Sequence, residues 1–216
     1  MTTTIADVWP LFALRLRTPR LELRPARDED LPGLVDAALA GVHDPATMPF
    51  GVPWTDASPE DLPAAFAKHL WDQRVRVAPE SWTVEFAVLE DGAPIGVQEL
   101  SAQAFAVRRT VTSGSWLTLD RHGRGLGTEM RAALLLFAFD HLEAEFAESG
   151  ALVWNAASLG VSRKLGYRDN GTARVQTRPG HLDEEQLVRL ARQDFVRPTW
   201  QLRVDGLDAA RQALVR

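Results

Sequence analysis

The sequence has no cysteine among its 216 residues. Without cysteine the chain can form no disulfide, no thiolate metal site and no covalent intermediate on a thiol. It also has no apolar run near the roughly 18 residues that a membrane helix needs, and its N-terminus lacks a basic region followed by an apolar core. These absences predict a cytoplasmic protein that binds no membrane.

Basic residues, 24 in number, are fewer than the 29 acidic residues. The formal net charge is −5, and no basic stripe interleaved with aromatic residues appears. This balance argues against nucleic-acid binding and fits an amine-bearing substrate. Two nucleotide-binding motifs are also absent, because no Gly-Lys pair completes a P-loop and Thr128 stands where a dinucleotide fingerprint would place its third glycine.

The composition that remains is typical of a globular domain, with 45% apolar and 25% charged residues. We expect one domain over residues 1–216, with a core at about 18–196 and a strand–helix tail at about 197–216. The periodicities predict an α+β fold with strands mostly in meander order. Strands are expected at 21–24, 82–89, 95–100, 111–119 and 144–148, with two more between 168 and 195, and helices at 28–39, 58–73, 128–139 and 155–167. Asp91-Gly92 predicts a hairpin, residues 104–110 a further turn, and Gly166 the end of the last helix. The helix at 128–139 is apolar on nearly all sides and is therefore expected to be buried.

The most informative stretch is SGSWLTLDRHGRGLG, which spans residues 113–127 and precedes an apolar helix. It predicts a strand, a glycine-spaced loop and a helix start. A helix start leaves about four backbone N–H groups unpaired and carries partial positive charge, so a loop that lets a ligand approach closely can bind phosphate. Gly123, Gly125 and Gly127 permit such an approach. Spacing alone leaves two readings open, a bent loop without a ligand and an anion site.

A second unusual stretch is the loop GVHDPATMPFGVPWT at residues 41–55, rich in proline, glycine and aromatics. It is either a packed surface loop or the wall of a substrate pocket. In the second reading His43, Asp44 and Trp54 are the substrate-binding residues.

Two motifs together carry a resemblance. HGRGLGT at 122–128 and NAASLGVSRKLGY at 155–167 resemble the GNAT superfamily of acyl-CoA-dependent N-acyltransferases, and TPRLELRPARDEDL at 18–31 is similar to its ribosomal-protein-alanine N-acetyltransferase branch. GVHDP and MPFGVPWT are similar to a succinyltransferase-like member. The resemblance implies a mixed, mostly antiparallel sheet, splayed near its middle by a bulge and flanked by helices. It also implies acetyl-CoA or succinyl-CoA as co-substrate and no metal.

The resemblance assigns the cofactor site residue by residue. The family's phosphate loop maps onto His122, Gly125 and Gly127, and His122 departs from its usual Gln or Arg. Backbone N–H groups of 123–128 would hold the pyrophosphate, and the strand at 116–119 would pair with the pantetheine arm. The implied cofactor-binding residues are Trp116, Leu117, Thr118, Leu119, His122, Gly123, Arg124, Gly125, Leu126, Gly127, Thr128, Asn155 and Ser158.

The general acid and the general base cannot both be taken over from the family pattern. An amine attacks a thioester only when neutral, so a base must accept its proton. Thr112 stands where the family places a glutamate base, and Ser162 stands where it places a tyrosine acid. The catalytic candidates are therefore Ser158 and Ser162 as donors to the sulfur and Glu99 as base, with Glu85, Asp44, His43 and His122 as further base candidates. A succinyl carboxylate would need a partner such as Arg108, Arg109 or His43.

Two functions follow from these patterns. The first is an N-acyltransferase that moves an acetyl or succinyl group to a primary amine by direct attack in a ternary complex. Its acceptor would be an amine-bearing small molecule, a protein N-terminus or a lysine. The alternative is a non-catalytic acyl-CoA-binding regulatory or assembly module, suggested by Thr112 and Ser162. Apolar residues in the 41–55 loop and the C-terminal tail favour a homo-oligomer.

Overall fold

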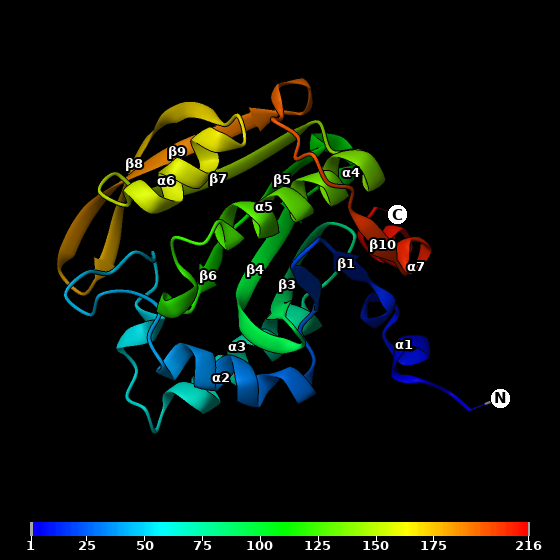
Figure 1. Ribbon diagram of the computed structural model, residues 1–216, viewed down its shortest axis with the longest axis horizontal. Coiled ribbons are helices and arrows are strands. Elements are labelled where there is room, and N and C mark those ends of the chain that lie inside the picture. Colours follow the sequence, from blue (N-terminus) through cyan, green and yellow to red (C-terminus); the bar gives the residue numbers. More distant parts are fainter. Residues whose placement is uncertain (1, 216) are drawn as a thin grey trace.

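The computed structural model describes residues 2–215, whose strands join in one twisted sheet (Figure 1). The path across the sheet is β10-β1-β2-β3-β4-β5-β7-β9-β8, and β6 pairs with β4 beside it. Only β5 and β7 pair in parallel; the other ladders are antiparallel. The bounds are β1 Arg15–Arg17, β2 Leu21–Pro25, β3 Ser81–Glu90, β4 Ala93–Gln103, β5 Thr110–Thr112, β6 Ser115–Leu117, β7 Phe146–Leu152, β8 Arg168–Arg178, β9 His181–Ala191 and β10 Arg203–Asp205.

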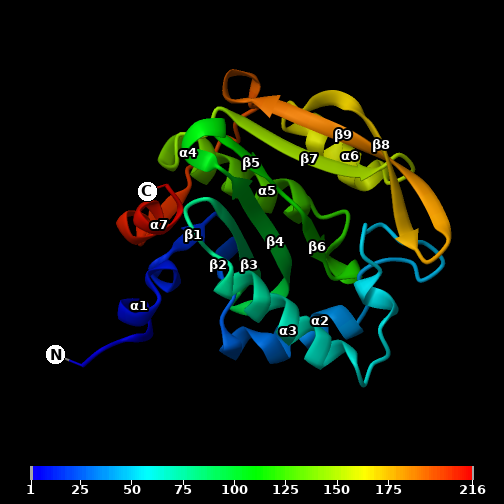
Figure 2. The same ribbon diagram turned by 180° about the vertical axis from the view of Figure 1, so that it is seen from behind.

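Helices cover both faces of this sheet. In Figures 1 and 2, α5 and α6 lie on one face, and α2 and α3 lie on the other. The expected mixed, mostly antiparallel sheet with flanking helices is confirmed. The bounds are α1 Ile5–Val8, α2 Leu31–Leu39, α3 Leu62–Val75, α4 Phe105–Arg108, α5 Leu126–Leu136, α6 Ala156–Lys164 and α7 Leu207–Leu214.

Helix α5 is the centre of the larger hydrophobic core. All but two of its residues are buried, and a π-helical turn over Phe137–His141 extends it. Its apolar residues pack against strands from β1 to β9 in one continuous cluster. The prediction of a helix buried on nearly all sides is confirmed. This packing gives α5 a fixed position, so its N-terminus is a rigid platform for the glycine loop.

The predicted hairpin between β3 and β4 is also confirmed. Asp91 and Gly92 take left-handed backbone angles, with φ of +50° and +81°, as a two-residue turn with the twist of a β-hairpin requires. The turn brings β3 and β4 into register over most of their length. This register places residues of the two strands directly opposite each other on one face of the sheet.

The strand expected at 111–119 is broken into β5 and β6 at Ser113 and Gly114. β5 pairs with β7 as far as Thr112 and Glu148, whereas β6 pairs only with β4. Side chains bond both carbonyls at the break: Ser149 Oγ donates to Ser113 O at 2.9 Å, and Gln98 Nε2 donates at 2.7 Å to Gly114 O, which also accepts from Glu99 N. The sheet therefore splays between β6 and β7.

Two further expectations need correction. The strand placed at 144–148 lies at 146–152, and the turn at 104–110 contains the short α4, bounded by left-handed Ala104 and Arg109. The expected tail consists of a strand and a helix, β10 and α7, and it joins the main core, because β10 pairs with β1 and Trp82 Nε1 donates to Leu214 O at 2.9 Å. No helix within 2–215 combines the length and hydrophobicity needed to cross a bilayer.

Candidate active site

The glycine loop opens helix α5 in the predicted way. Gly123 and Gly125 have φ of +72° and +80°, a region that side chains with a Cβ disfavour, and Gly125 is the N-cap of the helix. The first N–H groups of α5, at 126–128, have no acceptor within the helix. Residues 122–125 of the loop are exposed, and Gly127 and Thr128 are half-buried beside them, so an anion can approach this helix start.

An ion pair holds this loop against the sheet. Arg20 donates through Nη1 to Arg124 O at 3.0 Å, and its Nη2 lies 2.6 Å from Glu129 Oε2. Thr18 also donates to Glu129 at 2.6 Å. Since Glu129 is buried and neutralised by Arg20, its charge does not cancel the positive character of the helix start.

His122 is explained by a bond inside the protein. Its Nε2 lies 2.9 Å from Leu117 O, and because a carbonyl only accepts, Nε2 carries the proton. The ring thus ties the loop to the end of β6. The pyrophosphate reading needs only backbone donors from this loop, so the departure at His122 does not affect it.

The edge of β6 that faces away from β4 is open. Glu99 N donates to Gly114 O at 2.8 Å and Thr118 N donates to Ile95 O at 2.9 Å. Hydrogen bonds alternate along an antiparallel ladder, so the N–H groups of Ser115 and Leu117 point away from β4. No strand of the described residues pairs with that edge. An extended ligand can add to it as a strand would.

Helix α6 lies beside the glycine loop, because a Cβ added to Gly127 would lie 3.8 Å from Val161 Cγ2. Asn155 is its N-cap and accepts from Ser158 N at 3.1 Å. Ser162 is buried and donates to Ser158 O at 3.3 Å. The structure therefore brings the predicted residues of α6 to one helix face, with the Ser162 hydroxyl proton already engaged by the backbone.

The carboxylates Glu85 and Glu99 stand directly opposite each other on β3 and β4. Burial, and then the neighbouring Glu85, raise the pKa of Glu99, while Ser101 Oγ donates to Glu99 at 3.0 Å. His69 of α3 lies 3.1 Å from Glu85 through its Nε2, and this bond raises the pKa of His69. The Glu99 carboxylate also lies beside Gly114, where the strand breaks.

An aromatic cluster continues this face of the sheet. The rings of Trp54 and Trp116 are 5.4 Å apart, and Phe66 lies 6.0 Å from each. The 41–55 loop is therefore packed, and it also forms a wall next to β6. Trp54 packs against Trp116 of β6, whereas the side chains of His43 and Asp44 are bonded within the loop itself.

His43 and Asp44 hold the 41–55 loop in its shape. His43 bonds Thr55 Oγ1 at 2.7 Å, and Asp44 accepts from Ala46 N at 2.9 Å in an exposed turn. Arg109 is bound to Glu143 at 2.9 Å, and Arg108 is exposed on α4. Asp44 and Arg109 are thus engaged by their own neighbours, whereas Arg108 is exposed on α4.

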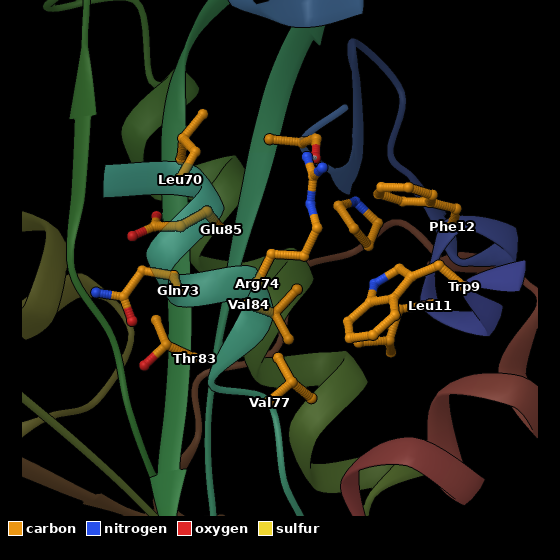
Figure 3. A pocket seen from close by; sticks show the side chains of 12 residues that line it. Trp9, Leu11, Phe12, Leu70, Gln73, Arg74, Val77, Thr83, Val84 and Glu85 are labelled. Atoms are coloured by element: carbon orange, nitrogen blue, oxygen red, sulfur yellow. Dashed lines mark hydrogen bonds between the residues drawn. The ribbon is translucent and has the colours of Figure 1, made fainter. Parts of the chain in front are cut away.

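Two clefts flank these features. The first is a cavity of about 30 Å³ between the N-terminal segment and α3, which has room for little more than water. In Figure 3, Glu85 and Gln73 turn their polar ends away from Trp9 and Phe12, so this cavity is a packing gap. The second, of about 280 Å³, adjoins the glycine loop, and its lining includes Arg20, Gly125, Thr128, Lys164, Arg197 and Trp200.

Sequence reasoning missed His69 and Arg131. His69 follows the buried Phe66 by three residues on α3, which puts it on the same side of the helix, but only the fold reveals its carboxylate partner. Arg131 was concealed within an apolar helix pattern. Among the described residues no group of three metal-ligating side chains occurs.

A glycine loop at a rigid helix start, beside a sheet with a splayed strand, defines a class of acyl-CoA-dependent transferases. A family model described as an acetyltransferase (GNAT) domain matches residues 20–168. The chain therefore belongs to the GNAT acetyltransferase family, whose co-substrate is an acyl-CoA.

Individual relatives share only part of the sequence with this chain. A Bacillus subtilis protein, YdaF, named as a candidate ribosomal N-acetyltransferase, is 30% identical over 91 residues, which is 42% of this chain and 49% of that protein. The chain thus matches about half the length of that relative.

Solved structures resemble the whole fold. Mycobacterium smegmatis RimJ in complex with CoA-disulfide has a TM-score of 0.68 at 17% identity, over 92% of each chain. A candidate ribosomal-protein-serine acetyltransferase from Vibrio cholerae has a TM-score of 0.62 at 19% identity, over 82% of this chain and 97% of that chain. Together they confirm the α+β GNAT fold.

Proposed function

We propose that this acetyltransferase-family protein moves an acyl group from acyl-CoA to a primary amine by direct attack in a ternary complex. The observation that carries the proposal is the arrangement of the glycine loop beside the open edge of β6. Unpaired N–H groups at 126–128 suit a pyrophosphate, and those of Ser115 and Leu117 suit the amides of an extended arm. The amide of Asn155, whose oxygen caps α6, is the third contact to that arm.

Glu99 is the general base of this proposal. It is half-buried beside the strand break, and its pKa is raised toward the working range of a base by burial and by Glu85. Only its ionised form accepts a proton from the amine. Glu85 and the half-exposed His69 stand behind it and can pass that proton to solvent. Trp54 and Trp116 wall the approach of the acceptor.

The donor is acetyl-CoA or succinyl-CoA. The cleft of about 280 Å³ beside Gly125 is basic and aromatic, which suits the nucleotide end of CoA. Ser158, whose side chain is half-buried at the first turn of α6, is a candidate donor to the sulfur. The names of YdaF and of the Vibrio cholerae structure suggest a ribosomal-protein N-terminus as acceptor. Because β10 and α7 share the main core, we also propose a single domain over residues 1–216, placed in the cytoplasm and self-associating.

A thiol-release assay tests this function. Acetyl-CoA and succinyl-CoA are each supplied with a panel of amines that contains peptides with free N-termini, lysine peptides, polyamines and small amines. Release of CoA that depends on one amine supports the enzyme. Tight CoA binding without turnover on any amine would instead support the non-catalytic module, which Thr112 and the backbone-bound Ser162 favour.

A further inference from the structure

Arg131 is a buried cation that lacks a carboxylate partner. It lies in the second turn of α5 and is 4% exposed. Among residues 2–215 no Asp or Glu pairs with its guanidinium, since Glu129 on the same helix is bound to Arg20 and Glu148 on β7 lies near Arg189. Burying an unpaired charge costs several kcal/mol, so a protein retains one only where something offsets that cost.

The guanidinium spans the two strands that diverge at the splay. Nη1 donates to Ser149 Oγ of β7 at 3.2 Å, and Nη2 lies 3.5 Å from Ser115 Oγ of β6. Its Nε has no acceptor. These weak, neutral contacts satisfy the geometry of the group without balancing its charge.

Two further hydroxyl groups near the guanidinium also lack a hydrogen-bond partner. The hydroxyls of Tyr167 and Ser113 are buried without a hydrogen bond of ordinary geometry, and Tyr167 lies near both Ser113 and Arg131. Burial raises the pKa of Tyr167, which keeps its O–H protonated. Tyr167 is thus a titratable group that faces Arg131. The cluster therefore offers N–H and O–H donors and lacks an anion to accept from them.

This cluster lies at the closed end of the splay. The β5–β7 ladder ends at Thr112 and Glu148, and Ser113, Ser115 and Ser149 follow at once on the two strands. On the proposed function, the pantetheine arm runs along the open edge of β6 toward this point, so its reacting end arrives beside the cluster. Ser162, which stands where the family has a tyrosine acid, has its proton bound to Ser158 O.

We propose that Arg131 forms an anion site at the closed end of the splay and that the leaving thiolate of CoA occupies it. The amine nitrogen bonds to the carbonyl carbon, the C–S bond breaks, and the sulfur leaves with the electron pair. The amine proton goes to Glu99, while the guanidinium keeps its protons and stabilises the thiolate by charge and hydrogen bonds. Water later protonates the released thiolate. This inference rests on the proposed function.

The proton acceptor and the anion site lie on opposite faces of the sheet. Glu99 lies on the α3 face with Glu85 and His69, whereas Arg131 approaches from the α5 face. The proton and the negative charge thus separate to opposite sides of the reacting carbon. A base and a cation in direct contact would instead neutralise each other.

The test titrates the thiol of bound CoA. The ultraviolet absorbance of the thiolate is followed against pH with the wild type, Arg131→Met, Arg131→Lys and the exposed control Arg108→Met, after calorimetry has shown that each binds CoA. An ordinary thiol has a pKa of about 8.5. We expect the bound thiol to titrate below that value in the wild type and in Arg108→Met, partly so in Arg131→Lys, and at or above it in Arg131→Met, because burial alone raises a thiol pKa.

Catalysis gives a second readout. With acetyl-CoA, Arg131→Met should lose roughly 100- to 1000-fold in kcat, as removal of one stabilising donor does, with little change in CoA affinity. An equal thiol pKa in the wild type and Arg131→Met would overturn the proposal. So would a loss confined to the KM of succinyl-CoA, which would assign the guanidinium to an acyl carboxylate. Failure of the wild type to bind CoA would reject the proposed function itself, a distinguishable result.

Discussion

Replacing Gly125 with glutamate places a negative charge where the pyrophosphate of CoA is proposed to bind. Gly125 has φ of +80°, so any side chain there costs about 1–2 kcal/mol of stability. A carboxylate about 5 Å from a phosphate adds a repulsion of about 3 kcal/mol at an effective dielectric constant of about 20. CoA affinity should therefore fall roughly a hundredfold beyond the effect of strain.

Gly125→Gln is the matched control, since it has the same shape and backbone strain without the charge. Thermal unfolding should give similar losses for both variants, whereas calorimetry should show much weaker CoA binding for Gly125→Glu alone. Arg20 lies 3.6 Å from the position of a Cβ at residue 125, but it is already bound to Glu129, which limits its ability to neutralise the new charge. Equal CoA affinities for the two variants would refute the placement of an anion at this loop.

Three more predictions concern the groups around the splay. Glu99→Gln should lower kcat roughly 100- to 10,000-fold at neutral pH, and wild-type kcat should fall as acid protonates Glu99 through its raised pKa; an unchanged rate in steady-state assays would transfer the role to another group. His69→Gln should be less stable than the wild type below the ordinary histidine pKa of about 6.5, and the difference should vanish as pH rises through the raised pKa of folded His69; denaturant midpoints that differ equally at every pH would contradict this. Asn155→Ala should cost about 0.5–2 kcal/mol of stability through loss of the α6 cap, and calorimetry should also show weaker CoA binding, whereas a stability loss with full affinity would leave Asn155 a structural cap.

Much of the fold was predictable because its signals are local. Asp91-Gly92 specified the hairpin, Asn155 and Gly166 marked the two ends of α6, and the apolar pattern after Thr128 indicated a buried helix. The break of the strand at Ser113 and Gly114 was not visible as such. It depends on Ser149 and Gln98, whose bonds to Ser113 O and Gly114 O form only when distant segments meet.

The candidate site divides in the same way. The glycine loop was recognisable because left-handed backbone and helix starts have fixed sequence requirements. The proposed base, Glu99, was only one of five candidates in the sequence, since it differs from other surface-strand carboxylates only through the opposing Glu85 and the distant His69. His43 and Asp44 attracted attention by residue type, but their partners are within their own loop.

The sequence by itself determined the strand–loop–helix unit around Gly125 and the helix start at Asn155, because backbone conformation and capping depend on neighbours along the chain. Only the tertiary structure decided which charges are paired. Arg131 and Glu99 are separated by 32 positions and lie on opposite faces of one sheet. Folding buries the Arg131 guanidinium and raises the pKa of Glu99 through burial and the opposing Glu85. Electrostatics depends on distance and desolvation in space, and a linear sequence specifies neither directly.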